Sequence, residues 1–416
     1  MSDTAGETPV LSVSTELVDD IRPLVPLVDP RHPLVFIRRG AGIAGIGEAL
    51  RLEFSGPSRF TDASATWMRI AAAARVSDPV VLPGSGLVAL GAFAFADESA
   101  QTSVLIVPSI VIGRRDGISW VTRIHAIEDG PSTGSLGTEA PLGDDFHVAF
   151  DFGPLDRPGY MAAVDAALVH LRANELSKVV LARSMVGHLP EGADLRVLLA
   201  ELATGYPDTW TFAVDGLIGS SPETLVTANG GTVTARVLAG SAPRGTDPAS
   251  DQDAAAALAT STKDLDEHQF ALRSLLASLA PHAANVTSSE QPFTLKLPNL
   301  WHLASDVEGD LSDGSSSLDL IAALHPTAAV AGTPTPAALA LIRQLEPFDR
   351  GRYAGPVGWI GADGDGEWAI ALRSAQVDPD GTVTAYAGAG IVIDSDPEQE
   401  MLETRMKFRP VIDAFA

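Results

Sequence analysis

Short apolar segments separated by turn residues dominate the first third of the chain. β-Branched and aromatic residues cluster or alternate within these segments, a pattern typical of strands. The predicted strands lie at residues 33–39, 48–54, 86–96, 102–115 and 118–124, and residues 63–76 have the spacing of an amphipathic helix. Before them, we expect residues 1–20 to form a flexible tail.

Residues 126–146 are rich in Gly, Ser and Pro and predict a surface loop at a candidate boundary. Beyond it, helices are predicted at residues 160–176, 264–281, 318–324 and 336–345 and after Asp396, and strands at 178–184, 210–240, 291–311, 357–377 and 382–392. Hairpins dominate this pattern. It therefore predicts an α+β fold with large, mostly antiparallel sheets and helices packed outside them. We expect residues 21–416 to form one domain.

The formal net charge of −25 narrows the range of partners. Nucleic acids and anionic membranes bind basic surfaces, so neither is expected here. The chain has no cysteine, which excludes disulfides and thiolate chemistry. No run of eighteen apolar residues predicts a membrane span, and the N-terminus lacks the pattern of a signal peptide. We therefore expect a cytoplasmic protein.

Three short motifs do not fit their usual functions. Residues 40–45 match G-x-G-x-x-G, but a strand pattern follows where a dinucleotide-binding fold needs a helix. Residues 130–134 match G-x-S-x-G inside the predicted loop, without a strand before or a helix after them. Residues 363–366, DGDG, lack the other ligands of a calcium loop and fit a hairpin turn.

Lys178 stands directly before four residues, VVLA, that read as a buried strand. A buried ammonium loses its hydration, so lysine usually avoids such positions. Lys178 is either a polar residue at a strand end or an amine that chemistry requires in a poorly solvated place.

Other polar residues have a structural and a functional interpretation. Glu400, Glu403 and Lys407 share one face of the last helix, which by itself predicts a solvated face. Glu267 lies at the edge of the apolar stripe on the helix at 264–281, beside a histidine expected to be packed. His302 lies between apolar residues of a strand, where a histidine is more often structural than catalytic.

Glu223 and Arg373 also have both a structural and a functional interpretation. Glu223 follows a proline and precedes a strand, as a cap or strand-edge residue does. Arg373 lies in an otherwise apolar strand and needs an anion, which is either a structural carboxylate or a ligand.

Eight motifs occur together in the order and approximate spacing of the chorismate-utilising enzymes. They are SKVVLARS, SSPETLV, ARVLAGSAPRG, KDLDEH, LWHLAS, LHPTAAVAGTP, GPVGWIGADGDGEWAIALRS and AGAGIVIDSDPEQEMLETRMK. One such motif is weak evidence, but eight in order are specific. The chain resembles this superfamily, and within it the isochorismate synthases, most strongly over residues 150–416.

The resemblance implies a role for each polar residue. Lys178 corresponds to the general base that activates water, Glu223 to the general acid, and His302 to the histidine beside the substrate ring. The implied magnesium ligands are Glu267, Glu403 and, nearby, Glu400. The implied substrate-binding residues are Gly240, Ser241, Ala329, Val330, Arg373, Tyr386, Gly388 and Lys407. Lys178 can act as a base only in its neutral form, which desolvation favours.

The implied activity is the Mg²⁺-dependent conversion of chorismate into isochorismate, a precursor of siderophores, menaquinone and salicylate. The resemblance also implies a monomer without a glutaminase subunit. Salicylate synthase, which goes on to expel pyruvate, is the main rival. His325 and Val330 favour the enzyme that stops at isochorismate, although Ala328 and Ala331 depart from its usual pattern. A non-catalytic chorismate-binding protein is disfavoured because every implied catalytic residue is present.

Overall fold

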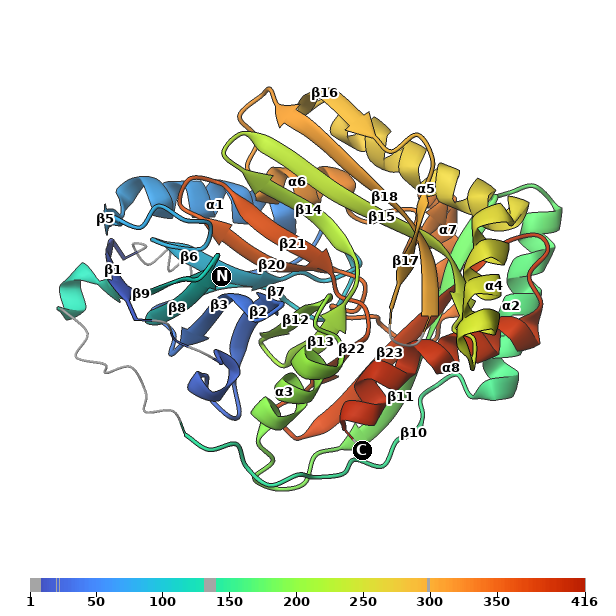
Figure 1. The fold of residues 1–416 in the computed structure, drawn as a ribbon, viewed down its shortest axis with the longest axis horizontal. Coiled ribbons are helices and arrows are strands. Elements are labelled where there is room, and N and C mark those ends of the chain that lie inside the picture. The colour runs from blue at the N-terminus through green and yellow to red at the C-terminus, as the bar shows by residue number, and fades with distance from the viewer. Residues whose placement is uncertain (1–8, 20, 22, 131–139, 298–299, 416) are drawn as a thin grey trace, which may run out of the picture.

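Two large β-sheets face each other and carry the helices on their outer sides and at one end (Figure 1). The computed structural model describes residues 9–19, 21, 23–130, 140–297 and 300–415. Within these residues, every pair of strands is antiparallel except β1 with β5. The prediction of an α+β fold with mostly antiparallel sheets is confirmed.

The larger sheet runs through both halves of the sequence. Its strands, in spatial order, are β10 (Asp151–Phe152), β11 (Lys178–His188), β23 (Thr382–Ile391), β22 (Ser374–Val377), β13 (Leu217–Ser221), β12 (Trp210–Val214), β2 (Leu34–Arg38), β3 (Ala41–Ile46), β8 (Ile110–Arg115), β9 (Ile118–Ala126), β1 (Leu11–Val18) and β5 (Arg75–Ser77). β19 (Gly332–Thr333) also pairs with β11. The C-terminal strands β22 and β23 lie between the central strands β11 and β13, and the N-terminal strands continue the sheet from β12, so both halves contribute to one sheet.

The smaller sheet is built in the same mixed way. Its strands, in spatial order, are β16 (Ala283–Ser288), β18 (Leu300–Leu311), β15 (Thr232–Pro243), β14 (Thr224–Asn229), β21 (Gly366–Ile370), β20 (Pro356–Gly361), β6 (Val88–Ala92), β7 (Ser103–Val107) and β4 (Leu50–Phe54), with β17 (Phe293–Lys296) paired to β18. The core lies between the sheets, where Phe93 packs edge-on against Trp368 with ring centroids 5.7 Å apart.

The helices cover the sheets on several sides. They are α1 (Arg59–Ala73), α2 (Arg157–Arg172), α3 (Leu195–Gly205), α4 (Pro248–Thr260), α5 (Thr262–Leu279), α6 (Ser317–Leu324), α7 (Thr335–Leu345) and α8 (Pro397–Ala414), together with the short 3-10 turns η1 (Val25–Leu27) and η2 (Ile127–Asp129). α5 packs on β15, α7 on β11 and α8 on β23. No helix of the described residues has the length and apolarity needed to cross a bilayer.

The N-terminal segment differs from the expected flexible tail. Leu11–Val18 forms β1, which pairs with β9 along its whole length. Leu11, Val13 and Thr15 are buried while Ser14 and Glu16 are exposed, so the segment has the period of a half-buried strand. The prediction for residues 1–20 was therefore wrong for β1, and residues 1–8 and 20 lie outside the described residues.

Two further expectations can be compared with the structure. Residues 40–45 lie in the hairpin of β2 and β3, as expected, and no helix follows β3. In the predicted loop at 126–146, residues 127–129 form η2 and residues 140–145 are exposed and without regular structure. Residues 131–139 of this loop lie outside the described residues.

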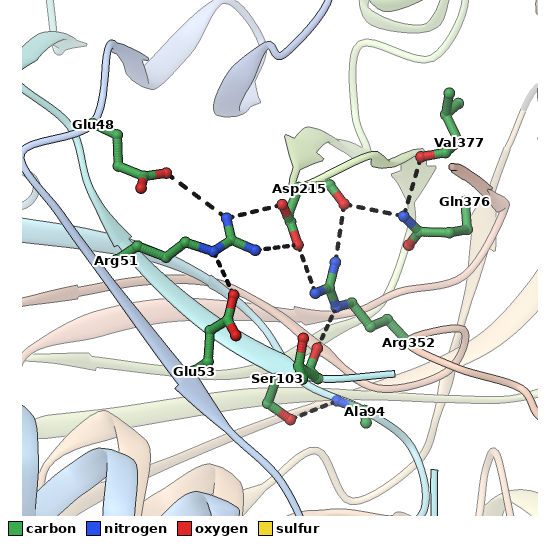
Figure 2. A network of polar contacts seen from close by, with 10 residues as sticks. Glu48, Arg51, Glu53, Ala94, Ser103, Asp215, Arg352, Gln376 and Val377 are labelled. Atoms are coloured by element: carbon green, nitrogen blue, oxygen red, sulfur yellow. Dashed lines mark hydrogen bonds and ion pairs between the residues drawn. The ribbon is translucent and has the colours of Figure 1, made fainter. Parts of the chain in front are cut away.

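A network of polar contacts joins the two sheets at the β12–β13 turn (Figure 2). There Asp215 accepts bonds of 3.0 and 2.9 Å from Arg51 of β4 in the smaller sheet. It also accepts a bond of 2.7 Å from Arg352, whose Nε donates to the carbonyl of Thr102. Gln376 of β22 donates to the backbone oxygen of Asp215. The network fixes the loop around Arg352 against both sheets.

Candidate active site

A cavity of about 210 Å³ is lined by residues of α5, β15 and β18 on one side and of β11, β23 and α8 on the other. Thirteen of the fourteen residues predicted from the sequence line it: Lys178, Glu223, Gly240, Ser241, Glu267, His302, Ala329, Val330, Arg373, Gly388, Glu400, Glu403 and Lys407. These residues come from segments far apart in the chain. Their convergence on one cavity supports a shared functional role.

Lys178 and Glu267 meet across this cavity. Lys178 is the first residue of β11 and is only 4% exposed, and its Nζ donates to Glu267 Oε1 of α5 at 2.7 Å. Burial opposes ionisation of Glu267, but the Lys178 ammonium outweighs it and holds the pKa of Glu267 below its usual range. A Cβ at residue 390 would lie 2.9 Å from Lys178 Cε, so Gly390 leaves the room that the lysine occupies.

Glu223 is a buried carboxyl group next to cations. It lies between β13 and β14, after Pro222, and is 5% exposed. Burial raises the pKa of Glu223 to about 7, and the positive charges of Lys178 and Arg373 offset only part of that shift. At neutral pH a substantial fraction of Glu223 therefore carries a proton that it can donate.

Arg373 is a buried cation that faces the cavity. It lies between β21 and β22 in a left-handed backbone conformation, with φ of 50°, and is 7% exposed. Burial lowers the pKa of Arg373, since no carboxylate of the described residues reaches its guanidinium to form an ion pair. A buried guanidinium without an anion is a binding site for one. This favours the ligand interpretation of Arg373 over the structural one.

His302 presents an unsatisfied ring nitrogen. On β18, its Nδ1 lies 3.2 Å from the carbonyl of Gly240, and its buried Nε2 has no partner among the described residues. Burial and the nearby Arg373 lower the pKa of His302 to about 3, so the ring is neutral at physiological pH. Nδ1 therefore carries the proton and donates it to Gly240, which leaves Nε2 free to accept a bond from a ligand.

Gly240 lies where the pairing of β15 with β18 shifts register, between Leu238 and Ser241. Its φ of +81° is one that glycine adopts without strain. The irregularity turns the Gly240 carbonyl toward His302. The resemblance implies that Gly240 binds the substrate, and in the structure its backbone also orients a side chain of the cavity wall.

The last helix turns three charged residues toward the cavity. Asp396 caps α8, as predicted, by accepting from the backbone N–H groups of Glu398 and Gln399. Beyond the cap, the residues that line the cavity are Glu400, Glu403 and Lys407. The solvated face that this helix predicts by itself is wrong for Glu400, which is only 5% exposed.

Charge on this face of α8 is only partly balanced. Lys407 Nζ donates to Glu403 Oε1 at 2.6 Å and to the carbonyl of Gly388 at 3.0 Å. Burial and the nearby Glu403 raise the pKa of Glu400 to about 7. Two carboxylates this close favour either a proton or a cation between them.

Three carboxylates, those of Glu267, Glu400 and Glu403, line the cavity, but they do not form a finished metal site. No group of three potential ligands among the described residues is gathered closely enough to hold an ion. Glu267 and Glu403 are each bonded to a lysine. Their oxygen atoms are nevertheless the ligand type that Mg²⁺ prefers, so the donor set fits this metal in chemistry.

Val330 adds an apolar wall. It follows α6 in the loop before β19, is 3% exposed, and lines the cavity with Ala329. Its side chain has no proton to donate. His325, the other residue used to predict the product, lies outside this cavity, where its Nε2 donates to the carbonyl of Phe95 at 2.9 Å.

The aromatic residue of the wall is not the one expected. Tyr353 lines the cavity, whereas Tyr386 is absent from its lining and stacks behind Tyr353, with ring centroids 5.2 Å apart. Tyr353 was not predicted, because a single sequence does not indicate which of two tyrosines lines the cavity and which packs behind it. It also missed Leu372 and Gly390, although both lie within the motifs that carry the resemblance.

His268 has the structural role that was expected of it. Fully buried on α5, it reaches the carbonyl of Ala239 with Nδ1 and the hydroxyl of Ser305 with Nε2, at 3.3 and 2.8 Å. It therefore anchors α5 on β15 and β18. This anchoring places its neighbour Glu267 at the cavity.

Fold and cavity together define an enzyme that binds a small anionic molecule, and comparison with known proteins specifies the family. The model of the chorismate binding enzyme family matches residues 145–416. The chain belongs to the chorismate-binding enzymes. The first relative in this family bears the name isochorismate synthase. DhbC of Bacillus subtilis is 40% identical over 289 residues, which are 66% of this chain and 71% of that protein.

The second relative extends the similarity into the N-terminal half. MenF of Mycobacterium tuberculosis is 35% identical over 357 residues, 82% of this chain and 89% of the relative. Among solved structures, DhbC from Bacillus anthracis superposes with a TM-score of 0.77. It is 32% identical, and the match covers 94% of this chain and 98% of that one. The similarity therefore covers both sheets.

Proposed function

We propose that the protein is an isochorismate synthase, which converts chorismate into isochorismate with the help of Mg²⁺. Water adds at C2 of the ring and the C4 hydroxyl leaves. The observation that supports this most is the joint placement on one cavity of a lysine, a carboxyl group with a raised pKa and a buried arginine that forms no ion pair among the described residues. These groups are Lys178, Glu223 and Arg373.

In this proposal the proton transfers balance. Lys178 removes a proton from water as the water oxygen bonds to C2 and the ring double bonds shift. The C4–O bond breaks as Glu223 donates its proton to the departing hydroxyl, which leaves as water. At the end of the step Lys178 carries a proton and Glu223 is ionised, so a return proton transfer completes the cycle.

In the structure Lys178 Nζ is occupied by Glu267, at 2.7 Å. Lys178 is therefore available as a base only when Glu267 takes another partner. Glu267, Glu403 and Glu400 are the residues that would hold Mg²⁺. When bound, the metal supplies positive charge for the substrate carboxylate and draws electrons from the conjugated ring.

Arg373 and Lys407 orient the substrate through charge. Chorismate carries two carboxylates, whereas the chain has a net charge of −25 that repels it at long range. A local positive field is therefore needed at the cavity. Arg373 forms no ion pair with a carboxylate of the described part of the chain, and Lys407 is held over the backbone of Gly388.

The buried Val330 supports a product that stops at isochorismate. Salicylate synthase needs an additional step that expels pyruvate, and a polar residue often stands at this position in pyruvate-expelling relatives. Here the wall is apolar. We further propose that the enzyme acts as a cytoplasmic monomer without a glutaminase subunit, since water and not ammonia is the nucleophile.

One assay tests the proposal. The purified protein is incubated with chorismate and Mg²⁺, with and without ammonium, and the products are separated by chromatography while pyruvate is measured. We expect isochorismate, little pyruvate and no effect of ammonium. Unchanged chorismate would contradict the catalytic proposal and favour a binding protein, and stoichiometric pyruvate with salicylate would identify the rival enzyme.

A further inference from the structure

A buried ion pair lies directly behind the reaction cavity. Glu346 follows α7, and Arg350 lies four residues later in the loop that leads to β20. The guanidinium Nη2 and Nε lie 2.6 and 2.8 Å from the two carboxylate oxygens. Both side chains are almost fully buried, at 3% and 2% exposure. Such a pair loses much of its Coulombic gain to desolvation, so its presence calls for a role beyond stability.

The pair replaces a missing neighbour at one edge of β11. β19 pairs with β11 only at Lys178 and Val179. Beyond that point, the carbonyl of Val180 accepts from Arg350 Nη2 at 2.8 Å, and the N–H of Ala182 donates to Glu346 at 2.7 Å. One donor and one acceptor thus satisfy the backbone groups that a further strand would have bonded.

The same arginine holds the apolar wall. Arg350 Nη1 donates to the carbonyl of Val330 at 2.9 Å. On the other side, the N–H of Val330 bonds to the carbonyl of Thr327, and the next carbonyl, that of Ala331, accepts from Val180. The backbone of Val330 is therefore fixed in both directions. The main chain that carries this side chain at the reaction cavity cannot shift without breaking these bonds.

The pair also separates two cavities. Arg350 lines the reaction cavity, and both Arg350 and Glu346 line a neighbouring cavity of about 780 Å³ beside Phe95 and Phe348. If Arg350 were shortened, the two spaces would join and water would reach the reaction cavity from behind Val330. A water molecule that enters by this route, or a displaced Val330, would alter how the substrate ring and its leaving groups are held.

We propose that the Glu346–Arg350 pair is a positioning element that fixes Val330 and seals the reaction cavity, and so controls which product is released. This inference rests on the proposed function. Arg350 is a positioning residue here because it acts through the backbone of Val330 and Val180 and not through the reacting atoms.

The test compares four variants with the wild type. Arg350→Met removes the guanidinium group with its paired donors. Arg350→Lys keeps the positive charge but not the paired donors, and Glu346→Gln keeps the shape of the side chain but not its charge. The double variant Glu346→Met with Arg350→Met removes both charges, so it leaves no unpaired buried ion and is expected to fold. Arg343→Met is the matched control, because Arg343 forms an exposed ion pair with Glu98 in the same region.

For each folded protein, kcat, KM and the ratio of pyruvate to isochorismate are measured with chorismate and Mg²⁺. We expect kcat of Arg350→Met and of the double variant to fall on the order of 10²-fold, because a small displacement of the groups that position a substrate has an effect of this size. The change in KM should be smaller. The pyruvate ratio should rise in both. Arg350→Lys should retain part of the activity, and Arg343→Met should match the wild type.

A purely structural pair would give a different result. The double variant would then regain wild-type kcat and product ratio along with its stability, and this outcome would overturn the proposal. So would unchanged kinetics in Arg350→Lys and Glu346→Gln, which stay informative if Arg350→Met does not fold. Failure of the wild type to form isochorismate would instead refute the proposed function, so the two failures are distinguishable.

Discussion

Lys178 and Glu267 form a nearly buried ion pair at the reaction cavity, with 2.7 Å between Nζ and Oε1. The residue expected to accept a proton is thus paired with a residue expected to bind the metal. This relationship makes proton transfer depend on what occupies Glu267. It also makes both residues sensitive to substitution of either one.

Lys178→Ala and Lys178→Arg should both abolish isochorismate formation. Alanine removes the base, and arginine keeps the ion pair with Glu267 but does not deprotonate at working pH. Loss of a general base lowers kcat by roughly 10²- to 10⁴-fold. Product chromatography measures this directly. Substantial turnover by Lys178→Arg would contradict the role of Lys178 as base.

Glu223→Gln should remove activity and also change how stability depends on pH. In the wild type the pKa of Glu223 is raised to about 7 in the folded state, from 4.5 in the unfolded chain. Folding is therefore favoured most below pH 4.5, and this contribution is lost as the pH rises through 7. Its size is on the order of 3 kcal/mol.

Urea denaturation of both proteins between pH 5 and pH 8 checks the second effect. Glutamine carries no such titration, so Glu223→Gln should gain stability relative to the wild type as pH increases. The kcat/KM of the wild type should also decline above about pH 7, where Glu223 has lost its proton. Parallel stability curves for the two proteins would show that Glu223 titrates normally.

Glu267→Ala and Glu403→Ala should abolish both Mg²⁺ binding and activity. Each removes a carboxylate from the proposed metal site, and few oxygen ligands remain. Isothermal titration with Mg²⁺ measures binding without reference to turnover. Glu398→Ala is the matched control, because Glu398 lies on the same helix in an exposed ion pair with Arg157. Full activity of EDTA-treated wild type would make the metal proposal wrong.

Arg373→Met should weaken substrate binding more than it disturbs the fold. The guanidinium forms no ion pair with a carboxylate of the described residues, so its removal breaks no ion pair and relieves a desolvation cost in the free protein. A charged hydrogen bond is worth roughly 1.5–3 kcal/mol, which corresponds to about a 10- to 100-fold rise in KM. Steady-state kinetics with chorismate, together with a melting curve, gives both quantities. A lower melting temperature with unchanged KM would favour a structural role.

Val330→Thr should release some pyruvate alongside isochorismate. The hydroxyl places a polar group on a wall that is apolar and 3% exposed in the wild type. A coupled pyruvate assay on purified Val330→Thr gives the ratio of products. Val330→Ile serves as a control because it retains an apolar surface. Equal pyruvate release by both variants would show that the hydroxyl group is not the cause.

Much of the fold and the site followed from local patterns in the sequence. Strand and helix periods gave most elements, and the spacing of Glu400, Glu403 and Lys407 placed them on one face of a helix. No local sequence pattern specifies what surrounds that face in the folded protein. Glu400 is buried only because α8 packs on β23, so its raised pKa required the three-dimensional arrangement.

Other differences have similar physical causes. Apolar and polar residues alternate in Leu11–Val18, as they do in a strand, but the polar residues around this segment are typical of a flexible tail. Pairing with β9 holds it as a strand. Arg373 was expected inside a strand, and it instead lies between two strands with φ of 50°. The order of Tyr353 and Tyr386 in the cavity wall depends on how the loop before β20 packs on β23, which a single sequence does not encode.

The carboxylate shared by Arg51 and Arg352 has a consequence for engineering this molecule (Figure 2). Arg352 immediately precedes Tyr353, so the spacing between the sheets and the outline of the pocket depend on one acidic side chain, that of Asp215. Libraries built to admit bulkier substrates should leave residue 215 untouched. Selections that randomise the whole gene should find this position intolerant, although it contacts no substrate in the proposed site.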